Sequence, residues 1–187
     1  MDTETTATGR RVGYARVSTA VVWATAFDRQ CHHEAGHAVA VAARGGTITR
    51  IVVVDPATAA DTDVGYVLHR TAARHQSFVT FAGPWAEASW SVLHDPDQGG
   101  QFDAALDLAW GNNSDGDGAR YAAVVDRLVD AAAALGLPAV GRAWEGDWCG
   151  ELEDLWPAIR AVATQLAAGT AVDHAAVVAA LAETDAA

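Results

Sequence analysis

Long runs of small and apolar residues, separated by short polar and glycine-rich segments, predict that most of the chain is helical. The stretch from Asp28 to Arg44 is Ala-rich and compatible with a helix, and Gly45–Gly46 is the residue type that best ends one. The stretch 74–94 is apolar enough for a buried helix, in which Gly83–Pro84 predicts a kink or a second half that starts at Pro84. Further helices are predicted over about 101–111, 118–136, 150–168 and 173–183, the last with Thr170 or Asp173 as its cap.

Two segments are typical of strands instead. ITRIVVVD, residues 48–55, is rich in β-branched side chains, and VGYVLHR, residues 64–70, follows it after a segment with turn chemistry. They predict a hairpin, or a pair in a small sheet, that packs against the first helix. The fold class is therefore α+β, mostly α, with residues 1–11 as a disordered polar tail and residues 12–187 as a single domain.

Composition and charge exclude several classes of function. The formal net charge is −12 with 12 basic residues, which argues against a surface that binds nucleic acid through its phosphates. No apolar run approaches the roughly 20 residues of a membrane span. The two cysteines, Cys31 and Cys149, are far apart and outside any C-x-x-C pattern, which favours reduced thiols. These features predict a soluble, cytoplasmic protein without nucleic-acid or membrane partners.

The segment CHHEAGHAVA carries the strongest chemical signal, His33-Glu34-x-x-His37. Side chains four residues apart lie on the same face of a helix, about 6 Å apart along its axis, so the two imidazoles can bind one ion. Zinc accepts imidazole nitrogen and lowers the pKa of a bound water to about 7, and Glu34 stands where a general base can take the proton. A catalytic zinc needs a third protein ligand, and a histidine pair on an apolar helix can also belong to an ordinary core.

The segments around this helix resemble the peptidase domain of the FtsH family of zinc proteases. HHEAGHAVA is similar to that family's zinc-binding helix, and ITRIVVVDP with VGYVLHR resembles the strand pair that follows it. FAGPWAEASW resembles the family's Gly-Gly-Arg-Ala-Ala-Glu helix at Gly83, Ala86 and Glu87. The resemblance runs from about Asp28 to Ala109, and it implies a zincin-like fold with a small sheet, a helical bundle and zinc-dependent peptide hydrolysis.

The resemblance also implies the third zinc ligand. GGQFDAALDLA is similar to the segment that carries the family's ligand aspartate, which falls on Asp103 in this chain. Glu87 and Asp107 are the alternatives, the latter one helical turn after Asp103. Without the resemblance, Asp103 is an exposed carboxylate at the start of a helix, stabilised by the helix dipole.

Two departures from the family change the expected activity. Pro84 stands where the family has arginine, and no G-x-x-x-x-G-K-[ST] motif of an ATPase occurs in the sequence. We therefore expect an ATP-independent zinc metalloendopeptidase that cuts peptides or flexible protein segments, as a homo-oligomer or with a separate partner protein. A catalytically inactive binding or regulatory module with the same fold is the alternative, as is a zinc ion that only stabilises the fold.

Two other features remain. NNSDGDG places Asn113, Asp115 and Asp117 at the spacing of a calcium loop, but Val124 occupies the position that needs a bidentate Glu, so a plain loop is predicted. The seven tryptophans indicate either a ligand groove or the core of a helical bundle, and we favour the core.

Overall fold

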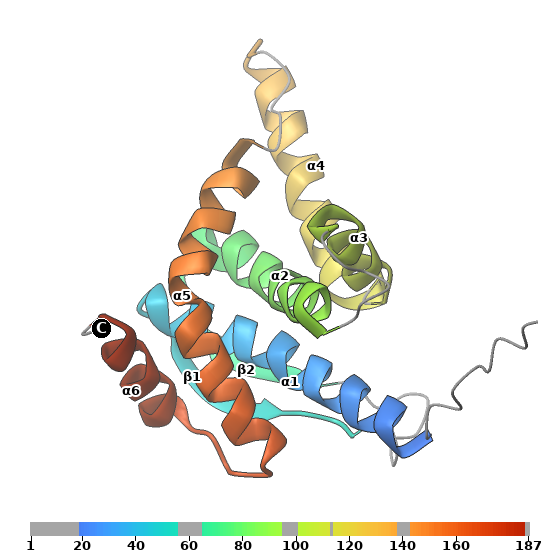
Figure 1. Cartoon of the computed structure of the whole chain (residues 1–187). Coiled ribbons are helices and arrows are strands. Elements are labelled where there is room, and N and C mark those ends of the chain that lie inside the picture. The colour runs from blue at the N-terminus through green and yellow to red at the C-terminus, as the bar shows by residue number, and fades with distance from the viewer. Residues whose placement is uncertain (1–18, 56–64, 95–100, 113, 138–142, 186–187) are drawn as a thin grey trace, which may run out of the picture.

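A computed structural model describes residues 19–55, 65–94, 101–112, 114–137 and 143–185 (Figure 1). The predicted polar tail, and the predicted domain boundary after residue 11, lie outside the described residues. The described part is mostly helical with one two-stranded sheet, which confirms the α+β, mostly α prediction. The elements are α1 (Thr19–Ala43), β1 (Thr47–Val52), β2 (Tyr66–Arg70), α2 (Gln76–His94), α3 (Phe102–Asn112), α4 (Ala119–Ala134), α5 (Ala143–Ala167) and α6 (His174–Asp185).

Helix α1 is the centre of the fold, because α2, α5 and the hairpin all pack around it (Figure 1). Residues 33–41 are buried without interruption. Gly36 allows this close packing, since a Cβ atom there would overlap the carbonyl oxygen of Ala82 and lie 2.8 Å from the Cβ of Ala86. The helix ends as predicted: Gly45 has φ of 67°, and the N–H of Gly46 donates to the carbonyl of Val41 at 2.8 Å.

The predicted hairpin is present, although both strands are shorter than expected. β1 and β2 pair antiparallel, with Thr47 opposite Arg70 and Val52 opposite Tyr66. Ile48 is the buried member of β1, and the strand contacts both α1 and α6. The pair therefore covers one side of α1, and Gly65, directly before β2, approaches the middle of that helix at Glu34 and Gln30.

Helix α2 is one helix that contains Pro84, so the prediction of a second half starting at Pro84 is wrong. Proline has no N–H and cannot donate to the carbonyl four residues earlier, which costs the helix one hydrogen bond. Burial of α2 compensates: every residue from Phe81 to Ala88 is buried against neighbouring elements. Tertiary packing of α2 thus outweighs the tendency of Pro84 to end the helix.

The second half of the chain adds helices around this pair. The predicted loop at 112–118 is wrong in its second part, because Ser114–Gly118 forms a π-helical turn, labelled η2, that runs directly into α4. Helix α5 starts at Ala143 rather than 150, and α6 starts after Asp173, whose carboxylate accepts the N–H of Ala176 at 2.9 Å. The predicted Asp173 cap is therefore confirmed.

One hydrophobic core joins α1, α2, α5 and α6 with the strands. Trp85 is buried in it, while Trp110, Trp148 and Trp156 are partly buried and pack against it. Trp90 is also buried, outside this cluster. Trp85 and Trp156 also line a pocket, so packing in the core and lining of a ligand groove both remain open for these two residues. None of the described helices has the length and apolar composition that a membrane crossing requires.

Candidate metal centre

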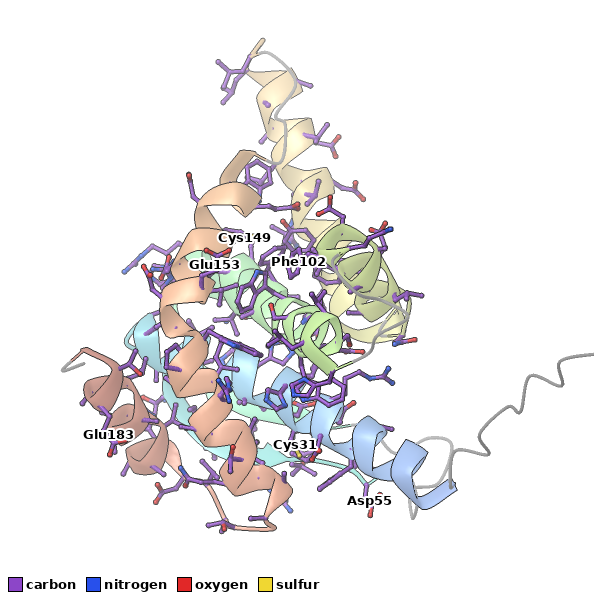
Figure 2. All side chains as sticks on the ribbon, viewed as in Figure 1. Cys31, Asp55, Phe102, Cys149, Glu153 and Glu183 are labelled. Atoms are coloured by element: carbon purple, nitrogen blue, oxygen red, sulfur yellow. The ribbon has the colours of Figure 1, made fainter. Side chains whose placement is uncertain are left out.

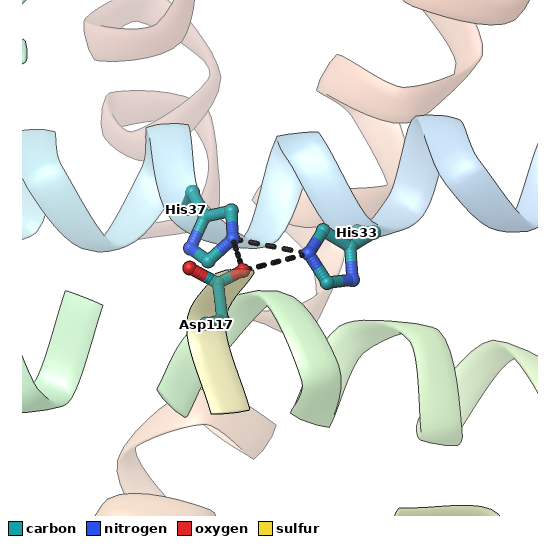
Figure 3. Close-up of side chains that lie close together, drawn as sticks. All are labelled: His33, His37 and Asp117. Carbon is teal, nitrogen blue, oxygen red and sulfur yellow. Dashed lines mark hydrogen bonds and ion pairs between the residues drawn. The ribbon is translucent and has the colours of Figure 1, made fainter. Parts of the chain in front are cut away.

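Three potential ligand atoms meet between α1, α2 and η2 (Figure 3). His33 and His37 project from the same face of α1, and their Nε2 atoms are 3.1 Å apart. The Oδ2 atom of Asp117, from the η2 turn, lies 3.1 Å from Nε2 of His33 and 2.9 Å from Nε2 of His37. The four-residue spacing thus gives the predicted convergence of the two rings, and a carboxylate completes the group.

The other nitrogen of each ring is held by an acceptor. Nδ1–H of His33 donates to Oε2 of Glu87 at 2.9 Å, and Nδ1–H of His37 donates to the backbone carbonyl of Val79 at 2.7 Å. A carboxylate and a carbonyl only accept hydrogen bonds at neutral pH, so both Nδ1 atoms carry a proton. Both Nε2 lone pairs then face each other and Asp117, an arrangement that needs a cation or an additional proton between them.

Gly83 on α2 lets the ring of His37 lie close against that helix. The ring of His37 lies directly over Gly83, where any Cβ atom would overlap the ring. This close approach brings His37 within reach of the Val79 carbonyl, one turn earlier on α2. Glu87, one turn after Gly83, accepts the hydrogen bond from Nδ1–H of His33. Gly83 and Glu87 are two of the positions on which the family resemblance rests.

The electrostatics of the group favour positive charge at its centre. Burial lowers the pKa of His33, but hydrogen bonds to Asp117 and Glu87 outweigh this effect and raise it to about 10. Burial raises the pKa of Asp117, but His37 and His33 hold it well below its usual range, and His33 has the same effect on Glu87. One buried carboxylate, Glu87, and one partly buried carboxylate, Asp117, are thus kept ionised around two imidazoles.

The residues present fit a zinc ion. Zinc bonds of about 2.0–2.1 Å at tetrahedral angles separate two ligand atoms by about 3.3 Å, which is close to the 2.9–3.1 Å between these three atoms. Two neutral imidazoles and one carboxylate are a ligand set that zinc uses in catalytic sites, where a fourth position remains for water. Asp117 keeps 15% of its side-chain surface exposed, so solvent reaches the group from that side.

The carboxylate of Glu34 lies beside this group and has one oxygen without a hydrogen-bond partner among the described residues. Its Oε1 accepts a hydrogen bond from the side-chain amide of Gln30 at 2.9 Å. Its Oε2 is buried and has no hydrogen-bond partner among the described residues. Burial raises the pKa of Glu34, against the opposing charges of His33 and His37. An unpartnered buried carboxylate oxygen is costly, and it marks a place where a further polar group fits.

The structure does not bring Asp103 to the histidines. Asp103 is exposed in the first turn of α3, and Asp107 is exposed one turn later. Glu87 does reach the group, but its carboxylate binds the outer nitrogen of His33. The carboxylate that meets the two histidines is that of Asp117.

From the sequence, Asp117 stands out only by its place in a segment with the spacing of a calcium loop, and it is not predicted to meet the histidines. The signal that points to it is the acidic, glycine-rich segment SDGDG directly before a helix, which forms the η2 turn. The turn faces α2, and Asp117 reaches His37 across 80 residues of sequence. A motif of two histidines gives no information on which distant carboxylate meets them.

Comparisons of the chain with protein-family models, curated proteins and solved structures give no significant match. Function must therefore be argued from the geometry of this group.

Proposed function

We propose that the chain is a zinc-dependent metallopeptidase in which His33, His37 and Asp117 bind the metal and Glu34 is the general base. The observation that carries the proposal is the convergence of two Nε2 atoms and one carboxylate oxygen within hydrogen-bond distance. The outward Nδ1–H groups are both held by acceptors, which is the usual support of metal-binding histidines.

Each residue has a defined part in the reaction. A bound zinc ion would supply a Lewis acid that makes water a good nucleophile near neutral pH. Glu34 takes the proton of the attacking water and passes it to the leaving amine, for which its raised pKa is favourable. Gln30 holds one oxygen of Glu34, so that the unpartnered oxygen is the one available for proton transfer.

The β-hairpin supports a peptide as the substrate. A Cβ atom at Gly65 would overlap Glu34 and lie 2.9 Å from Gln30, so the chain enters β2 directly beside the proposed base. Strand β2 pairs with β1 in a sheet of two strands, so its other edge carries no strand among the described residues. An extended peptide or flexible protein segment can add to such an edge through main-chain hydrogen bonds.

Peptide hydrolysis itself rests on the resemblance to FtsH-type peptidases. Gly83 and Glu87, which match that family's second helix, are the residues that place His37 and His33. The family's ligand aspartate was assigned to Asp103 by sequence, and the geometry supports Asp117 in its place. An ATP-independent activity in the cytoplasm, as a homo-oligomer or with a partner protein, stays a prediction.

The first test is the zinc content of protein purified without a histidine tag. We expect about one zinc per chain in the wild type and in Asp103→Asn, and a large loss of zinc in Asp117→Asn. Both substitutions remove one carboxylate charge, so Asp103→Asn is the matched control. Zinc loss in Asp103→Asn with retention in Asp117→Asn would reverse the assignment.

The second test separates binding from chemistry. Glu34→Gln should keep one zinc per chain, because Glu34 is not a ligand, and should lose at least about 100-fold in peptide cleavage. Wild-type turnover in this variant would rule out Glu34 as the base.

One observation favours a second candidate function. His33, Asp117 and His37 already bond to one another, and an additional proton on an imidazole can satisfy the group without a metal. The domain would then be a catalytically inactive binding or regulatory module. That candidate predicts no zinc uptake even after zinc is added, and peptide or partner binding that chelators do not change.

A further inference from the structure

A pocket lies on the other side of α2, between α2, α3 and α5. It has a volume of about 330 Å³. Three aromatic side chains, Trp85, Phe102 and Trp156, form much of its wall, and Ser89, Cys149 and Glu153 are its polar members. Val92 and Leu93 complete the lining, and we call the whole the aromatic pocket. Figure 2 shows the labelled Phe102, Cys149 and Glu153 near one another where α3 and α5 face each other.

The aromatic pocket is separate from the candidate metal centre. Successive residues of a helix turn by about 100°, so Trp85 and Ser89 lie about 120–160° around α2 from Gly83 and Glu87. The metal centre is on the face that packs on α1, and the aromatic pocket is on the opposite face. Helix α2 therefore forms a wall of both, and neither site needs the other.

The three rings of the aromatic pocket pack against one another through Trp85. Trp85 and Trp156 meet nearly at right angles, with ring centroids 5.8 Å apart and an interplanar angle of 80°. Phe102 approaches Trp85 from α3, with a centroid distance of 6.0 Å. Aromatic faces that surround a small volume attract cations, because each ring presents negative charge on its face.

The charged residue among those that line the aromatic pocket is acidic. Glu153 is exposed at its rim and has no ion pair or hydrogen bond among the described residues. Burial and the carboxylates of Glu153, Glu145 and Asp103 raise the pKa of the Cys149 thiol, against a hydrogen bond from Trp85. No arginine lines the pocket, and the chain contains no lysine. A cation placed there would find an aromatic wall and an uncompensated carboxylate.

We propose that the aromatic pocket binds a small organic cation with an aromatic or branched apolar body. The volume lies at the lower end of the range for ligand pockets, about 300–1,000 Å³, and is about twice a cavity that holds one benzene molecule. The rings take the apolar body, and Glu153 takes the ammonium group. Binding is independent of zinc and of peptidase activity.

Three ligands of similar shape and different charge test the proposal: 2-phenylethylammonium, 2-phenylethanol and 3-phenylpropionate. Binding is followed at low salt from the indole N–H resonances of Trp85 and Trp156. We expect the cation to bind about tenfold more tightly than the alcohol, and the anion to bind most weakly. Equal affinity for cation and alcohol would show an apolar pocket without charge recognition, and no binding of any of the three would overturn the proposal altogether.

Glu153→Gln and Asp154→Asn identify the source of the charge preference. The two carboxylates are exposed neighbours on α5, but only Glu153 lines the aromatic pocket. Glu153→Gln should reduce the cation preference to about threefold or less, and Asp154→Asn should leave it close to tenfold. An equal reduction in both variants would show that only the overall charge of the protein acts, against the proposed contact.

A covalent readout places the ligand without relying on affinity. Cys149 lines the aromatic pocket, whereas Cys31 is fully buried in the core. The cation should slow alkylation of Cys149 by iodoacetamide at least about threefold, with Cys31 as the unreactive internal control. An unchanged rate at saturating cation would place the ligand elsewhere and contradict the proposal.

Discussion

At the scale of single residues, His33 shows how neighbouring side chains orient a proposed zinc ligand. Its Nδ1–H is held by Glu87, which also accepts a hydrogen bond from Asn112 and lies 3.5 Å from the guanidinium of Arg29. A carboxylate held from several sides fixes the orientation of the ring and increases the basicity of Nε2. Glu87 was considered as a ligand from the sequence, and it acts instead on the outer side of His33.

This role gives a prediction for Glu87→Gln. The amide is a weaker acceptor and carries no charge, so zinc affinity should fall about 10–100-fold while the protein stays folded. Competition with a chromogenic chelator measures the change. Asp107→Asn, which removes an exposed carboxylate from α3, is the control and should bind zinc like the wild type. Wild-type affinity in Glu87→Gln would contradict the proposed orientation of His33.

At the scale of secondary-structure elements, the crossing of α1 and α2 brings together most of the residues of the candidate metal centre. Gly36 on α1 and Gly83 on α2 remove the side chains that would keep the helices apart. The sequence predicted both helices, and the pattern HExxH predicted which residues of α1 share a face. It did not predict which residues of α2 meet that face, because helix packing depends on contacts far apart in sequence.

Gly83→Ala tests the crossing. A methyl group at this position overlaps the His37 ring, so we expect a loss of about 1–3 kcal/mol in the free energy of unfolding, together with weaker zinc binding. Gly150→Ala in α5 is the matched control, since its added methyl group meets no atom within 4 Å. It should stabilise the protein by about 0.5–1 kcal/mol, because alanine favours a helix interior. Urea unfolding measures the free energy of unfolding of both variants. Equal changes in the two variants would contradict the close approach of the His37 ring to Gly83.

At the scale of the whole molecule, the apolar core is a source of stability that is separate from any bound metal. The packing of α1 with α2, α5 and α6 is apolar, and the described cluster of buried residues runs through all four helices. Chelation should therefore lower the melting temperature and leave the far-UV circular dichroism spectrum helical at 25 °C. Unfolding on chelation would instead favour a zinc ion that only stabilises the fold.

The stability of the metal-free protein should depend on pH in a defined direction. The pKa of His33 is raised from 6.5 to about 10, so its contribution is complete below about pH 6.5 and is lost as the pH rises towards 10. The lowered pKa of Asp117 contributes above about pH 3.8, and this contribution is lost in acid. Melting temperatures in the presence of a chelator should thus fall between pH 6.5 and 9.5.

Zinc should reverse this trend, because it binds only the deprotonated ring of His33 and so competes with the proton. The increase in melting temperature on adding zinc should grow from pH 6 to pH 9. Thermal unfolding at three pH values, with and without zinc, measures it. A zinc effect that does not change with pH would argue against His33 as a ligand.

The sequence by itself determined the helices, the hairpin and the shared face of His33 and His37, because these depend on residues close together in the chain. The left-handed conformation of Gly45 and the Asp173 cap also depend on neighbouring residues, and the sequence predicted both. Only the tertiary structure decided that Asp117, rather than Asp103, meets the histidines. The partners that complete the centre, Glu87, Val79 and Asp117, lie 54, 42 and 80 residues from the histidines they contact. Such contacts form only when α2 and η2 pack on α1, and no local pattern specifies them.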